Sequence, residues 1–282
     1  RPASISRSTS GAAPRSRPSG SAPAAHRDGI LTAASLMVGA PAAADAVARA
    51  RRLPNLRVGL HVVLLESRSV LPRDDVPDLV DADGHFRRDM VRLAFEIFAR
   101  PRVRKQMQAE VAAQFSAFRD TGLTLDHVNA HKHFHLHPTI LSVVMDEARK
   151  AGVRGLRMPV EVAAVVDACE SGASSPGSRM TAWWAKTLAA RARKAGFVVP
   201  DQVFGLAWSG AMTASRVAAL LDRLPDGDTE IYFHPATADT FPGHAKSYRY
   251  TDELAALTDA AVITAAKRAA ASRGGFLDLD AT

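Results

Sequence analysis

The sequence predicts an α/β fold in which parallel strands alternate with helices. Strand-like apolar runs and helical patterns follow one another along the chain, and this alternation implies a parallel sheet with right-handed crossovers. A second observation is that the chain's most unusual histidines follow predicted strands. Because such folds bind ligands at the carboxyl ends of their strands, we expect a functional site at that edge.

The 282 residues are enough for one large domain, or for one domain with a tail. The hydrophobic fraction of 47% and the charged fraction of 23% are typical of a soluble globular protein. No apolar run reaches the roughly 18 to 20 residues that span a bilayer. The single cysteine, Cys169, excludes an intramolecular disulfide and a cysteine-rich zinc site.

The net charge of +7 comes largely from residues 1–24, which contain four arginines and no acid. Without them 32 basic and 29 acidic residues remain, so we expect no nucleic-acid binding. No basic amphipathic helix stands out, although a mildly basic protein can contact anionic lipid. We predict a disordered or aberrant segment over residues 1–25, whose composition resembles a transit peptide, and a folded domain over residues 26–282.

The elements of the first half are predicted from periodicity and turn residues. Residues 30–38 read as a strand, and Pro41 opens a helix. Residues 57–65 form a continuous apolar run, which predicts a strand buried on both faces. Residues 66–90 are loop-like, and residues 104–120 form an amphipathic helix on which Glu110 and Gln114 are expected to face solvent.

The second half continues the same alternation. A helix over residues 139–150 begins after Pro138, and Trp183 and Trp184 lie in a later helix. The remaining predicted elements are a strand over 156–159, a loop over 168–178, a strand over 203–208, a helix over 214–224, a strand over 229–234, a helix over 252–273 and a strand over 276–279.

Residues 125–138, LDHVNAHKHFHLHP, hold half of the ten histidines: His127, His131, His133, His135 and His137. As a strand end, this segment would place the last four imidazoles on one face. As a helix, it would bring them together in pairs four residues apart. Both conformations favour a metal or acid/base site. The alternative is a solvated loop that binds metal adventitiously.

His61, this histidine cluster and His234 lie on three different predicted strands. Two or three imidazoles with a carboxylate suit a divalent metal in hydrolysis, because the metal lowers the pKa of bound water and polarises a carbonyl. His234 could then protonate the leaving group. The sequence has no GxSxG, GxxxxGK[ST] or GxGxxG motif, so serine-hydrolase, P-loop and dinucleotide-binding designs are poorly supported.

Four segments carry a family resemblance: GLHVVLLE around His61, LDHVNAHKHFHLHP, RMPVE from Arg157, and TEIYFHPAT around His234. Together they resemble the YdjC-like carbohydrate deacetylases, and most closely the hopanoid biosynthesis-associated branch (HpnK). The resemblance implies a distorted (β/α) barrel, a divalent metal (Mg²⁺ or Zn²⁺) and removal of acetyl groups from N-acetylated sugars. The implied substrate is the N-acetylglucosaminyl group of a hopanoid side chain.

By the same resemblance, His61 and His131 correspond to metal ligands and His234 to the acid/base histidine. Arg157, His133 and His135 correspond to residues that line the substrate site. The implied partner is a small or lipid-linked amino sugar. The implied location is the cytoplasm, and both peripheral membrane contact and a homodimer are compatible with it.

The sequence departs from the family at its start. The family opens with a strand carrying ADDFG, which supplies the metal aspartate, whereas the first Asp-Asp pair here is Asp74-Asp75, in a predicted turn. We therefore expect the first strand to be missing, residues 1–24 to be an out-of-frame or misassembled reading, and metal binding and activity to be weak. Two alternatives stay open: a catalytically impaired sugar- or lipid-binding member, and a metal-dependent phosphoester hydrolase.

Overall fold

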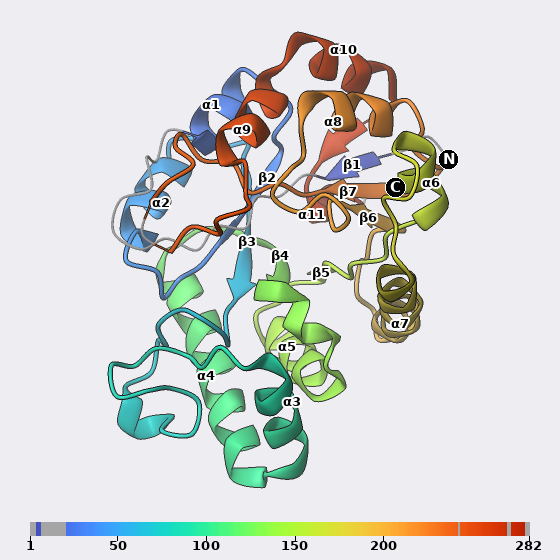
Figure 1. Cartoon of the computed structure of the whole chain (residues 1–282). Coiled ribbons are helices and arrows are strands. Elements are labelled where there is room, and N and C mark those ends of the chain that lie inside the picture. The colour runs from blue at the N-terminus through green and yellow to red at the C-terminus, as the bar shows by residue number, and fades with distance from the viewer. Residues whose placement is uncertain (1–3, 7–20, 242, 270–271, 280–282) are drawn as a thin grey trace.

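The computed structural model describes residues 4–6, 21–241, 243–269 and 272–279. Its strands form two four-stranded sheets, in the orders β2-β3-β4-β5 and β6-β7-β1-β8, and all paired strands are parallel. Helices connect the strands and lie around them (Figure 1). The predicted α/β fold with parallel strands is confirmed, and the arrangement is consistent with a distorted (β/α) barrel.

The first sheet contains β2 (Ala33–Leu36), β3 (Arg57–Val62), β4 (Leu125–Ala130) and β5 (Gly155–Leu156). A bulge interrupts the pairing of β3 with β4. Val58 pairs with Leu125 but Leu60 pairs with Val128, so β4 contributes one extra residue opposite Gly59. A Cβ atom at Gly59 would lie 2.4 Å from the ring of His127. Only glycine leaves room for this buried imidazole.

The second sheet contains β6 (Gln202–Phe204), β7 (Asp228–Ile231), β1 (Ser4–Ser6) and β8 (Ser272–Gly274). β1 lies between β7 and β8. This differs from the expected disordered segment without an opening strand, because the backbone groups of β7 and β8 offer a short extended segment a place to pair. Our expectations for residues 1–3 and 7–20 lie outside the described residues.

Helix α1 (Ser21–Arg27) begins the continuous part of the structure. It packs against α9 (Tyr250–Thr258), Ala25 is fully buried, and the N–H of Ile30 donates to the carbonyl of Leu257 at 3.0 Å. The predicted domain boundary between residues 25 and 26 falls inside this packed helix. The apolar contacts of α1 come from a distant part of the chain.

The remaining helices are α2 (Ala43–Ala50), η1 (Arg73–Asp75), α3 (Met90–Ala99), α4 (Pro101–Asp120), α5 (Pro138–Lys150), α6 (Ala163–Cys169), α7 (Pro176–Lys194), α8 (Ala214–Leu221), α10 (Ala260–Ala269) and α11 (Phe276–Leu279). Across the part of the chain that the structure describes, no helix combines the length and apolarity needed to cross a bilayer.

Two predicted elements at the C-terminal end are corrected. The predicted strand over 276–279 is helix α11, because the carboxylate of Asp126 accepts the N–H groups of Phe276 and Leu277 at 3.0 and 3.1 Å. The predicted helix over 252–273 divides into α9 and α10 at Asp259, whose backbone is extended. Its carboxylate accepts the N–H groups of Ala261 and Val262, and so begins the second helix.

The histidine stretch adopts neither of the two predicted conformations. β4 ends at Ala130, and His131–Leu136 form a short 3-10 segment, η2. Within it Lys132 and His133 have φ values of 51° and 53°. This left-handed backbone, uncommon for residues other than glycine, turns the chain so that alternate histidines no longer share a face.

Side chains of α4 hold the loop after β3 in place by hydrogen bonds to its backbone. Glu110 accepts the N–H groups of Val70 and Leu71 at 2.9 and 3.0 Å, and Gln114 bonds both backbone groups of Val63. Glu110 and Gln114 are buried, so the prediction that they face solvent was wrong. They satisfy loop amides that would otherwise be left unpaired.

Candidate active site

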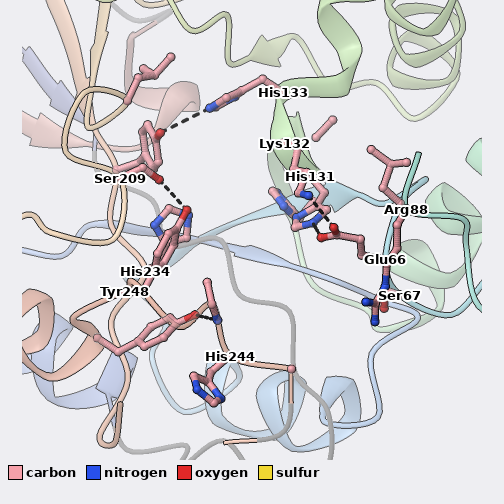
Figure 2. Close-up of a pocket in the computed structure, with 18 of the residues that line it drawn as sticks. Glu66, Ser67, Arg88, His131, Lys132, His133, Ser209, His234, His244 and Tyr248 are labelled. Carbon is pink, nitrogen blue, oxygen red and sulfur yellow. Dashed lines mark hydrogen bonds and ion pairs between the residues drawn. The ribbon is translucent and has the colours of Figure 1, made fainter. Parts of the chain in front are cut away.

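A cavity of about 670 Å³ opens where the strands of both sheets end. Side chains at or just after the ends of β3, β4, β5, β6 and β7 line it (Figure 2). Five of the six predicted site residues are among them: His61, His131, His133, Arg157 and His234. The predicted convergence of separate strand ends on one site is therefore present in the structure.

His61 and His131 form the pair at one wall of the cavity. Their ring centroids are 5.7 Å apart and the rings meet edge to face. His61 is 3% exposed, and burial holds its pKa well below the usual value, with nearby His131 adding to the effect. His61 is therefore neutral near pH 7 and carries a single ring proton.

The amide of Asn129 decides where that proton lies. In the orientation that satisfies its neighbours, the Asn129 NH₂ group donates to His61 Nδ1 at 2.5 Å. Its oxygen then accepts from the Arg157 guanidinium at 3.2 and 3.3 Å and lies 2.8 Å from the Ser35 hydroxyl. Since Nδ1 of His61 is an acceptor here, its proton resides on Nε2, and this nitrogen offers no lone pair.

Glu66 closes the same wall from the loop after β3. Its carboxylate accepts from Lys132 Nζ at 2.6 Å and lies 3.5 Å from His131 Nε2 (Figure 2). The hydrogen bond from His131 lowers the pKa of Glu66 to about 2, with partial burial opposing it and Lys132 assisting. Glu66 is thus an ionised carboxylate beside the imidazole pair.

The donor set fits a divalent metal only in part. His61 and His131 bring two imidazoles together, as a metal site requires. Among residues 4–6, 21–241, 243–269 and 272–279, no group of three or more histidine, cysteine, aspartate or glutamate side chains could hold a metal ion. In the orientation of Asn129 described above, His61 Nε2 carries the ring proton and has no lone pair to offer a metal. The described residues therefore supply two ligands and not a complete site.

Arg157 forms the floor of the cavity. Its guanidinium donates two hydrogen bonds to Glu230, at 2.8 and 2.5 Å, and both side chains are almost fully buried. The same cation lies 5.0 Å from the centroid of the Tyr232 ring. Burial raises the pKa of Tyr232, so its hydroxyl stays protonated and available as a donor.

His133 and His234 flank Tyr232. His133 Nε2 lies 3.5 Å from the Tyr232 hydroxyl, and its buried Nδ1 has no hydrogen-bond partner within the described residues. Burial and the charge of Arg157 hold the pKa of His133 well below its usual value. His234 packs edge-on against Tyr232 at 5.5 Å and beside Tyr248 at 5.0 Å. The rings of His133, Tyr232, His234 and Tyr248 thus form one aromatic wall of the cavity, to which the two histidines contribute imidazole nitrogens.

His135 does not line this cavity. It is fully buried behind it, and its Nε2–H donates to the carbonyl of Arg157 at 2.7 Å. Burial lowers its pKa to about 4. His127 also points into the interior, 2.8 Å from Asp126 and 2.9 Å from the Ser35 hydroxyl. Both histidines stabilise the fold through these buried hydrogen bonds. The set of Ser35, His127 and Asp126 lies outside the cavity.

Several cavity residues were missed by the sequence analysis, chiefly Glu66, Lys132, Ser209, Tyr232 and Tyr248. Two of these residues could have been found from their positions in the sequence. Glu66 directly follows the apolar run that contains His61. Tyr232 lies two positions before His234, so in the predicted strand over 229–234 the two side chains would share a face. Ser209 and Tyr248, whose hydroxyls are 2.8 Å apart, come from loops with no periodic pattern.

Comparison with known proteins places these features in a family context. Residues 21–268 match the family described as YdjC-like protein. A carbohydrate deacetylase from Geobacillus stearothermophilus is 31% identical over 242 residues, which cover 85% of this chain and 82% of that protein. A carbohydrate deacetylase from Brevibacillus brevis is 40% identical over 126 residues, covering 45% of this chain and 48% of that one.

The fold is also found in a solved structure. It is a protein from Enterococcus faecalis V583, described as a candidate cellobiose-phosphate cleavage protein. It superposes with a TM-score of 0.74 over 99% of both chains, at 22% sequence identity. At 22% identity this similarity establishes the fold alone.

Proposed function

The chain belongs to the YdjC-like protein family, and we propose that it is a carbohydrate deacetylase, a hydrolase that removes an acetyl group from an N-acetylated sugar. The observation that carries the proposal is the meeting of His61, His131, His133, Arg157 and His234 in one cavity. The relative from Geobacillus stearothermophilus, matched over most of both chains, supports the same activity.

The cavity suits a polar sugar ring. Its volume lies within the usual range for small-molecule sites. The partly exposed ring of Tyr248 offers an apolar surface in the cavity, while the hydroxyls of Ser209 and Tyr232 offer polar groups beside it. We expect the sugar to pack against Tyr248 with its acetamido group toward the histidines.

In the proposed reaction, water adds to the acetyl carbonyl, the C–N bond breaks, and acetate and a free amine leave. The amine nitrogen must gain a proton as the bond breaks. His234 is our candidate for delivering it, because this imidazole lines the cavity beside Tyr232. The protonated hydroxyl of Tyr232 is a second donor close to the same place.

We propose that His61 and His131 hold a divalent metal, Mg²⁺ or Zn²⁺. Such an ion would polarise the carbonyl and lower the pKa of a bound water. For His61 to bind it through Nε2, the Asn129 amide has to turn over, so that its oxygen accepts from Nδ1. This turn points the Asn129 NH₂ group at the Arg157 guanidinium, so we expect weak metal binding.

A second candidate function rests on the same observation. With two imidazole ligands, and no group of three within the part of the chain that the structure describes, the protein could bind amino sugars and turn them over slowly or not at all. The substrate within the proposed class is also a proposal: the motif resemblance favours the N-acetylglucosaminyl group of a hopanoid.

The test is acetate release from an N-acetylglucosaminyl hopanoid, with and without added Zn²⁺, Mg²⁺ or Co²⁺. We expect metal-dependent release that falls at least tenfold in His234→Gln. His85→Gln, which changes an exposed histidine outside this cavity, should match the wild type. Saturable sugar binding without acetate release would select the impaired member, and phosphate release from a sugar phosphate would favour the phosphoester hydrolase.

A further inference from the structure

Helix α3 exposes an apolar face that no predicted element accounted for. Val91, Phe95 and Phe98 are 77%, 67% and 67% exposed. Their spacing of four and then three residues places them on one side of the helix. Two phenyl rings and a valine on successive turns form a contiguous patch, unlike the single apolar residues scattered over ordinary protein surfaces.

The opposite side of α3 is apolar as well. Leu93 and Ile97 are buried, and α3 packs against α4 (Figure 1). A helix that packs on one side and faces water on the other normally carries polar residues on its outer side. The outer side of α3 therefore has the composition of a contact surface.

The segment that carries this patch is rich in basic residues. Residues 87–105 carry seven basic and two acidic side chains. One acid, Asp89, caps the first turn of α3 by accepting the N–H of Arg92. The other, Glu96, is buried beneath Arg87, Arg92 and Arg100. Both acids thus have structural partners, and a third acid, Asp78 of the preceding loop, pairs with Arg102 at 2.9 Å. The seven basic side chains still outnumber these three acids, so the segment around the patch has a basic surplus.

We propose that α3 docks this protein on an anionic lipid surface. Val91, Phe95 and Phe98 enter the boundary between headgroups and acyl chains, and the surrounding arginines face the lipid phosphates. An apolar stripe with a basic border is the pattern of helices that lie in the membrane interface. A second copy of the chain is a poorer occupant, since a self-complementary contact would bring two basic segments together.

The first turn of α3 lies close to the candidate active site. A second hollow, of about 510 Å³, shares Glu66 and Arg88 with the main cavity and also contacts Arg92 in the first turn of α3. A lipid surface bound along α3 would thus lie near this second hollow. The docking itself does not depend on the proposed deacetylase activity.

The experiment is co-sedimentation of the full chain with vesicles of equal parts phosphatidylglycerol and phosphatidylcholine, and with vesicles of phosphatidylcholine alone. We expect binding to the anionic vesicles that weakens in 0.5 M salt (roughly a 4 Å screening length). Phe95→Ser/Phe98→Ser should bind about tenfold more weakly or worse. The matched control is Met180→Ser/Trp183→Ser, which removes equally exposed apolar side chains from α7.

Circular dichroism and light scattering accompany the binding data. Unchanged folding of both variants, with loss of vesicle binding in the α3 variant alone, supports the proposal. Equal losses in both variants, or no binding by the wild type, overturn it. A wild-type dimer that the α3 changes dissociate, without vesicle binding, also overturns it and assigns the patch to a second copy.

Discussion

The buried pair of Arg157 and Glu230 gives a direct test of how the floor of the cavity is held. Glu230→Gln keeps the size of the side chain and one acceptor oxygen but removes the negative charge. The guanidinium, 1% exposed, then stays out of water without its bidentate carboxylate. Breaking a buried pair from one side costs about 3–5 kcal/mol. We expect about 3 kcal/mol, because the glutamine oxygen still accepts one bond.

Urea unfolding followed by circular dichroism measures this loss. The matched control is Glu170→Gln, because Glu170 accepts two bonds from Arg216 in the same fork geometry, at 2.7 and 3.0 Å. That pair is 28% and 46% exposed, so its loss should cost less than about 1 kcal/mol. If the two variants lose equal stability, or Glu230→Gln loses less than about 1 kcal/mol, the reasoning is refuted.

The double variant Arg157→Met/Glu230→Met separates stability from function. Two apolar side chains of similar length remove both buried charges, so unfolding free energy should return to within about 1 kcal/mol of the wild type or exceed it. The cavity would still lose its cation beside Tyr232. We therefore expect a stable protein that no longer binds an amino sugar, and a calorimetric titration reports this.

Three further predictions concern residues around the cavity. His135 has a folded pKa of about 4 against about 6.5 unfolded, so the unfolded chain takes up its proton first as pH falls. His135 should thus contribute about 3 kcal/mol to the stability lost between pH 6.5 and 4, beside the losses from His61 and His133, and denaturation at both pH values should show the loss reduced by that amount in His135→Gln. Asn129→Asp makes His61 Nδ1 a donor and frees Nε2, so zinc affinity by calorimetry should rise about tenfold; unchanged affinity contradicts the assigned tautomer. Gly59→Ala places a methyl group against His127 and should cost about 3 kcal/mol, whereas an unchanged melting temperature would show that the ring can move aside.

Local pattern was enough to predict much of the fold. The apolar run of β3 and the helices α4 and α5 were predicted because their periodicity is carried by neighbouring residues. The sequence also predicted that His61, Arg157 and His234 lie in one site, because parallel strands end at a common edge. These predictions needed no knowledge of long-range contacts.

The predictions that failed depended on partners distant in the sequence or on rare backbone conformations. The left-handed pair Lys132 and His133 broke the alternation expected of the histidine stretch. Helix α11 requires the carboxylate of Asp126, 150 residues earlier. Glu110 is buried because the loop after β3 supplies its donors. A single window of sequence contains none of this information.

The bulge opposite Gly59 also restricts the register in which β3 and β4 can pair. A pairing of β3 with β4 shifted by one residue would drive the His127 ring into a side chain and leave the polar groups of Asp126 unmatched in the interior. Such a sheet could not close. The same alignment sets His61 opposite Asn129. The close approach of Gly59 and His127 therefore fixes the alignment of the sheet and, through it, the pairing of His61 with Asn129 at the candidate site.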